Sequence, residues 1–156
     1  MILCAIALAA WFAWPQGVDA RRMVDNFAAE QARIDAPKRE TLLHRAVPAS
    51  AFSQRASAAG WRSVAIWDGR LHGRDWVAVV WEKAGHRVVY GELDGPPLAA
   101  PAGFGRTGRE GVLLYGSEGD LRNVVTWTVG DRPAVLSGAD LPLGDLYDLA
   151  GGAARR

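Results

Sequence analysis

The sequence has little cysteine and almost no excess of charge of either sign. Its single cysteine, Cys4, excludes an intramolecular disulfide framework and a cysteine-rich zinc cluster within this chain. Lys and Arg together number 18 and Asp and Glu 17, so the formal net charge is +1. A nucleic-acid interface needs an excess of basic residues, so we expect no nucleic-acid partner.

Catalytic and metal-binding motifs are missing as well. The three histidines, His44, His72 and His86, lie far apart and lack a ligand spacing such as His-x3-His, which favours surface histidines over a metal site. The segment 116–119 (Gly-Ser-Glu-Gly) is not the Gly-x-Ser-x-Gly turn of a hydrolase. No nucleophile has a recognisable partner base. We therefore predict a non-enzymatic protein with no catalytic residue, metal or cofactor, and keep a hydrolase as the weakest alternative.

A long apolar run occupies the N-terminus. Every one of residues 1–14 is apolar, whereas a transmembrane helix needs about 20 such residues. The run is therefore typical either of a signal-peptide core or of the remaining part of a truncated membrane span. No Lys or Arg precedes it, as a signal peptide would require, and Trp11 and Trp14 suit the aromatic belt of a bilayer, so we favour the anchor. Arg21 and Arg22 would by themselves hold the following residues in the cytoplasm.

The residues after the run predict a helix over 17–36, which Pro37 ends. A seam with helical spacing runs along it, at Ala20, Val24, Phe27, Gln31 and Ile34. One interpretation is a linker helix that lies on its own domain. The other is a parallel dimer contact beside the membrane, with the pairing residues Ala20, Val24, Phe27 and Ile34, although the polar Gln31 weakens it.

The rest of the sequence predicts an α+β domain of two three-stranded antiparallel units flanked by short helices. A helix begins near Pro48, and a closing helix over 143–150 is capped by Asp140. The expected strands are 61–67, 76–81 and 87–93 in the first unit, and 112–115, 122–129 and 134–137 in the second. A segment rich in Gly, Pro and Ala, 94–108, separates the two halves.

One domain accounts for most of the chain length. The chain of 156 residues, 49% of them hydrophobic, can build one core of about 100 to 150 residues but not two. We expect a membrane anchor or signal segment (1–16), a juxtamembrane helix and linker (17–47), the α+β domain (48–150) and a tail (151–156).

The seven tryptophans are the unusual feature of the composition. Strand alternation would place Trp61 and Trp67 on one face of the first strand, and Trp76 opposite Trp81 in the second. Both faces are apolar, so we expect the sheet to be covered on both sides. The tryptophans either pack in the core or offer an exposed platform to a glycan or protein partner, for which Trp61, Trp67 and Trp81 are the candidates.

Short motifs run through residues 48–150 in a set order. The first half has Ala-Gly-Trp-Arg-Ser-Val at 59–64, Asp-Gly-Arg at 68–70, Gly-Arg at 73–74 and an apolar strand followed by Gly-His at 77–86. The second half has Asn-Val-Val-Thr-Trp at 123–127, Ala-Val-Leu-Ser-Gly at 134–138 and a Leu-rich helix at 143–150. The ordered set resembles the extracytoplasmic domain of membrane-anchored bacterial anti-sigma factors.

This resemblance implies a single-pass membrane protein that regulates transcription, with its C-terminal domain outside the cytoplasm, against the signal of Arg21 and Arg22. Family members hold a sigma factor through a cytoplasmic domain, often with a His-x3-Cys-x2-Cys zinc motif, which this sequence lacks. We therefore expect a sigma factor as partner only if a missing N-terminal domain exists. The other expected partners are the membrane and an unidentified protein, such as a regulatory protease. The alternative is a secreted or anchored module that binds cell-wall glycan through exposed tryptophans.

Overall fold

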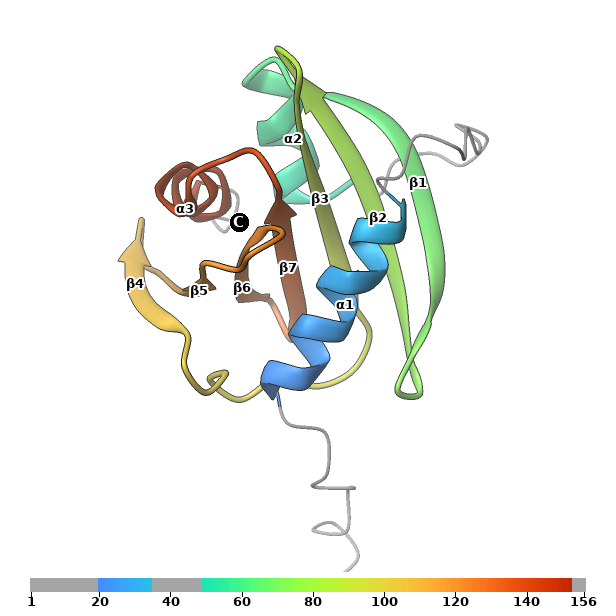
Figure 1. Ribbon diagram of the computed structural model, residues 1–156, viewed down its shortest axis with the longest axis vertical. Coiled ribbons are helices and arrows are strands. Elements are labelled where there is room, and N and C mark those ends of the chain that lie inside the picture. The colour runs from blue at the N-terminus through green and yellow to red at the C-terminus, as the bar shows by residue number, and fades with distance from the viewer. Residues whose placement is uncertain (1–19, 35–48, 153–156) are drawn as a thin grey trace, which may run out of the picture.

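The computed structural model describes residues 20–34 and 49–152 (Figure 1). These residues form three helices, α1 (Ala20–Ile34), α2 (Ala51–Ala58) and α3 (Leu143–Gly151). They also form seven strands: β1 (Arg62–Leu71), β2 (Arg74–Lys83), β3 (His86–Leu93), β4 (Gly105–Arg109), β5 (Val112–Ser117), β6 (Asn123–Val129) and β7 (Arg132–Gly138). The predicted α+β class is confirmed.

All seven strands belong to one antiparallel sheet with the order β1-β2-β3-β7-β6-β5-β4. The two expected three-stranded units are therefore joined, because β3 pairs with β7, with Tyr90 opposite Leu136. The sequence prediction also missed β4, which lies in the segment taken as a break. Its residues, Gly-Arg-Thr-Gly-Arg, show no apolar alternation and none is buried, so only pairing with β5 reveals the strand.

Three hairpins share the same two-residue turn. Both turn residues have positive φ in each: 50° and 80° at His72 and Gly73, 50° and 83° at Ala84 and Gly85, and 49° and 84° at Glu110 and Gly111. Positive φ at both positions is the type I′ geometry, whose twist matches that of the adjoining strands. Because the first turn is this short, β1 extends to Leu71, past the expected strand end at Trp67.

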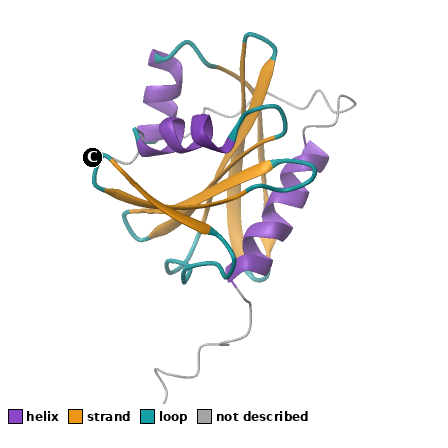
Figure 2. Ribbon diagram, turned by 60° about the vertical axis from the view of Figure 1, so that its left-hand side comes forward, coloured by secondary structure: helices purple, strands orange, loops and turns teal. Residues whose placement is uncertain are grey.

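Helices cover both faces of the sheet, as its two apolar faces predicted. Figure 2 shows α2 and α3 on one side and α1 on the other. Under α2 and α3, Phe52 stacks on Tyr90 with ring centroids 4.1 Å apart and meets Trp81 edge to face. Tyr90 in turn stacks on Trp127 at 5.9 Å, so aromatic rings connect the two halves of the sheet.

An irregularity in β1 reverses the expected alternation of its tryptophans. The pairing with β2 skips Val64, since Ser63 lies opposite Trp81 and Ala65 opposite Val80. One extra residue moves the following side chains to the other face. As a result Trp61 packs with the cluster under α2 and α3, and Trp67 with the cluster under α1. The prediction that they share a face is wrong.

The expected N-terminal membrane helix finds no support in the described residues. None of their helices is long and apolar enough to cross a membrane. The helix α1 is amphipathic, with exposed residues such as Arg21, Arg22 and Asp25 opposite its buried side. The anchor or signal segment, 1–16, lies outside the described residues.

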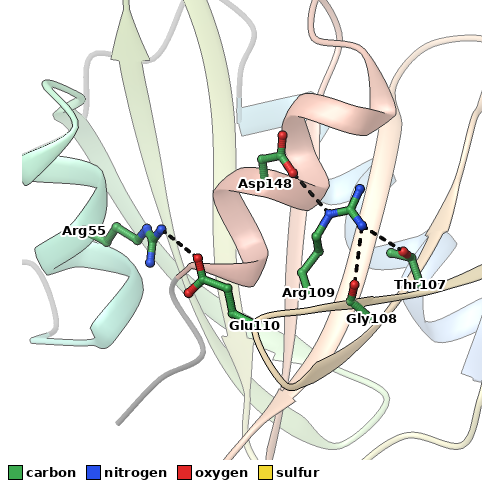
Figure 3. Close-up of polar contacts among 6 residues, drawn as sticks. All are labelled: Arg55, Thr107, Gly108, Arg109, Glu110 and Asp148. Carbon is green, nitrogen blue, oxygen red and sulfur yellow. Dashed lines mark hydrogen bonds and ion pairs between the residues drawn. The ribbon is translucent and has the colours of Figure 1, made fainter.

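A polar clasp holds α2, α3 and the β4–β5 hairpin together (Figure 3). Arg55 of α2 lies 3.5 Å from Glu110 in the hairpin turn and donates a hydrogen bond to the Gly152 carbonyl. Arg109 of β4 pairs with Asp148 of α3 at 3.2 Å. A Cβ atom at Gly152 would overlap the Arg55 guanidinium. The two glycines 151–152, expected only to end the helix and begin the tail, therefore also make room for these arginines.

Gly91 in β3 offers a direct test of how α1 is seated. A Cβ there would lie 2.3 Å from Phe27 Cζ, so Gly91→Ala should push this ring out and lower the free energy of unfolding by about 1–3 kcal/mol. The matched control is Gly108→Ala on exposed β4, where an added Cβ meets nothing within 4 Å, and it should change stability by less than about 0.5 kcal/mol. Urea unfolding of both variants measures the difference, and equal losses would contradict this packing.

Candidate functional site: the docked helix

The helix α1 lies across β2, β3 and β7 and buries one side against them (Figure 1). Met23, Val24 and Phe27 are at most 2% exposed. They pack on a cluster of sheet residues from the three strands, among them Trp76, Ala78, Val80, Val89 and Val135. The helix is therefore an integral part of the domain.

The predicted pairing seam faces this sheet. Ala20, Val24 and Phe27 are all buried within the described chain, and the side chain of Ile34 lies outside the described residues. Of the two interpretations, the structure favours the helix that lies on its own domain. A dimer contact through Ala20, Val24 and Phe27 is not available while α1 is docked, because their surface is already covered.

Phe27 is the central anchor of the helix. Its ring sits over Gly91, where the absence of a side chain leaves space, and meets Trp76 edge to face at 5.4 Å and 78°. An edge-to-face pair gains about 0.5–1.5 kcal/mol beyond the burial of its area. The sequence identified Phe27 as part of the seam but gave no signal for Gly91. A glycine inside a strand does not indicate which side chain will occupy the space above it.

A buried polar contact fixes the next turn of α1. Ser137 of β7 donates a hydrogen bond to the Gln31 side-chain oxygen, and Arg122 donates to the Ser137 hydroxyl at 3.3 Å. Gln31 and Ser137 have no exposed surface. Among the described residues the Gln31 amide nitrogen has no hydrogen-bond partner, and a buried group left in this way costs about 1–3 kcal/mol. This turn therefore holds less tightly than the apolar turns before it.

The outer side of α1 contacts two loops. Arg21 donates to the Ala102 carbonyl at 3.3 Å, in the connection before β4, and pairs with Asp25 at 3.5 Å. Asn26 lies 2.8 Å from a ring nitrogen of His72, in the β1–β2 turn. These exposed contacts add little stability, but they place the β1–β2 turn and the connection before β4 next to one helix.

The three candidate tryptophans do not form one surface. Trp81 is 2% exposed and lies in the core beside Phe52, so its proposed role as a partner or ligand surface is wrong for this conformation. Trp61 and Trp67 are half-buried, and they pack with clusters on opposite faces of the sheet. A ligand on one face cannot stack on both.

A small cavity with acidic side chains in its lining lies over β2 and β3 beside α2. Its volume is about 90 Å³, and it is lined by Ser53, Asp75, Trp76, Val77, Val79, Tyr90, Glu92, Asp94 and Arg132. Tyr90 donates to Glu92 at 2.5 Å, and Arg132 pairs with Asp94 at 3.4 Å. In the described part of the chain no group of three His, Cys, Asp or Glu side chains could hold a metal ion. His44 lies outside that part.

The pKa of Tyr90 is raised well above its usual value of 10, first by burial and then by the charge of Glu92. The folded state therefore keeps the phenol proton at a pH where the unfolded chain releases it. Stability from this group is complete below about pH 10 and is lost as the pH rises further. Tyr90→Phe should reduce the slope of unfolding free energy against pH, by up to about 1.4 kcal/mol per pH unit. Denaturant unfolding at about pH 9 and about pH 11 measures it, and parallel slopes for the variant and the natural protein would contradict the assignment.

Comparisons with known proteins identify no relative. No family model, no curated protein and no solved structure matches this chain. The resemblance to anti-sigma outer domains, which comes from the motifs in the sequence, stays a prediction.

Proposed function

We propose that this chain is a non-enzymatic, membrane-anchored regulatory protein whose α+β domain is the outer, sensing part of an anti-sigma-factor-like transcriptional regulator. The observation that supports the proposal is the docking of α1. This helix begins at Ala20, shortly after the apolar residues 1–14, and it packs into the same sheet that forms the rest of the domain. Any event that changes the domain at this sheet therefore acts on the segment next to the anchor.

The mechanism is a shift between docked and released α1. A partner can drive the shift only if it binds the two states with different affinity. To change a ratio of 99:1 in favour of docking into its reverse, the partner must bind the released state about 10⁴-fold more tightly. The polar contact of Gln31 with Ser137 lowers the cost of release, because both groups regain hydrogen bonds to water when they separate.

The proposed partner is a protein outside the cytoplasm, and a regulatory protease suits this mechanism. A protease cleaves extended backbone. The backbone of docked α1 is helical and protected, whereas a released α1 can unfold and be cleaved. A sigma factor is a proposed partner only if a cytoplasmic domain precedes the apolar run. The proposed location is the cell membrane, with a single pass and residues 48–150 on the outer side.

The location is tested with the full chain carrying a C-terminal epitope. We expect the epitope in the membrane fraction, and we expect protease added to intact spheroplasts to remove it. A cytoplasmic protein expressed in the same cells is the control for lysis. An epitope that resists protease until the membrane is opened would contradict the proposed topology.

The coupling is tested by releasing α1 in the full chain. Phe27→Asp places a charge in the buried interface and should release the helix, whereas Ala29→Asp puts the same charge on the exposed side of α1. We expect Phe27→Asp to increase cleavage of the chain and to change transcription of a small set of genes. Ala29→Asp should behave like the natural protein. If both variants leave transcription and cleavage unchanged, the regulatory function is wrong.

A further inference from the structure

The strand β1 forms one edge of the sheet along ten residues (Figure 1). Within residues 20–34 and 49–152, no strand pairs with its outer side. An edge of this length presents a row of backbone donors and acceptors to another chain. Such an edge is a pairing surface if its side chains also match those of a partner strand.

The type I′ turn at His72 and Gly73 determines which backbone groups point outward. In a two-residue hairpin the residues that close the turn, here Leu71 and Arg74, form a hydrogen-bonded pair, and pairs alternate from there. The groups of Ile66, Asp68 and Arg70 are therefore directed away from β2. A partner strand must place its own outward residues opposite these.

The other edge of the sheet is less suited to pairing. The strand β4 is only five residues long, and the side chain of Arg109 donates at 3.4 Å to the Gly108 carbonyl, one of its outward groups. Short edges and side chains that cover the backbone protect a sheet from pairing. The strand β1, with ten residues, is twice as long as β4.

We propose that β1 pairs antiparallel with β1 of a second copy of this chain, about a two-fold axis that passes by Gly69. This register places Asp68 of each copy opposite Arg70 of the other, with the outward backbone groups of both residues facing each other. A shift of the axis by one residue would oppose Asp68 to Asp68 or Arg70 to Arg70. Like charges directly opposite destabilise a sheet, so the charges select the register at Gly69.

The opposite face supports the same register. Trp67 lies opposite Leu71 of the second copy, and both side chains are half-buried in the single chain and gain cover on pairing. At the axis the two Gly69 residues meet as a non-hydrogen-bonded pair, the closer of the two antiparallel spacings. The Trp76 ring already covers Gly69 on this face, at 2.7 Å from where a Cβ would lie. In the proposed dimer, the apolar surfaces of the two copies therefore meet around Gly69, which has no side chain.

Arg70 can reach the second copy at little cost. In the single chain it lies 3.6 Å from Asp75, with both side chains more than 70% exposed, and it donates to the Gly73 carbonyl at 3.4 Å. Exposed ion pairs of this kind contribute about 0–1 kcal/mol, so exchanging one for another is nearly neutral. The proposal concerns the outer edge of the sheet and does not rest on the proposed function.

The test is a charge exchange in the full chain, studied in detergent micelles by analytical ultracentrifugation. We expect the natural chain to form a dimer. Asp68→Arg and Arg70→Asp should each raise the dimer dissociation constant about tenfold or more, because each puts like charges in both cross-strand pairs. The double variant Asp68→Arg/Arg70→Asp restores opposite charges and should restore the dimer. Arg106→Asp on β4 makes the same charge change at the other edge and should leave the dimer intact.

Each result decides the proposal. A natural chain that stays monomeric, with the edge covered by its own residues or left unpaired, would overturn it. A dimer that persists in both single variants would also overturn the proposal. Association through residues 1–14 would give this result. Circular dichroism of the single variants checks that they fold, and restoration by the double variant separates a lost pair from a lost fold.

Discussion

The seating of Phe27 over Gly91 is the contact on which the architecture of this domain depends. Gly91 belongs to β3, a strand near the middle of the sheet, and its missing side chain is what lets α1 approach. Once Phe27 is in place, the same helix covers Trp76, Val89 and Val135, which would otherwise be exposed apolar surface. Burial of this kind is the dominant stabilising term in folding, so a glycine in one strand determines how an entire face of the sheet is protected.

The two faces of the sheet are held in different ways. The face under α2 and α3 is closed by aromatic stacking and by the clasp of Arg55 and Arg109, which connects segments distant in sequence. The face under α1 depends on a single helix, whose last described contact is the polar pair of Gln31 and Ser137. A buried polar contact stabilises less than the apolar packing beside it, and the proposed regulation acts at this end of α1.

Most elements could be predicted because their residues carry local signals. Strands such as β2 and β6 have alternating or continuous apolar residues bounded by turn residues, and the helices show apolar spacing. The strand β4 could not be predicted, because Gly105 and Gly108 leave no apolar pattern. The faces of Trp61 and Trp67 were also missed, since the irregularity at Val64 arises from pairing with β2 and has no local signal. The candidate site was predicted in part. The sequence showed the apolar seam on α1 but not the sheet surface against which it packs.

The sequence by itself determined the α+β class, the order of the predicted elements and the amphipathic character of α1, because these follow from residues close together in the chain. Only the tertiary structure decided that β3 pairs with β7 to unite the halves, that the seam of α1 faces its own sheet and that Trp81 is core. These features depend on contacts between residues far apart in the chain. Several surfaces of similar apolar character could pack against an apolar helix face or strand. Only the complete packing of the domain selects one of them.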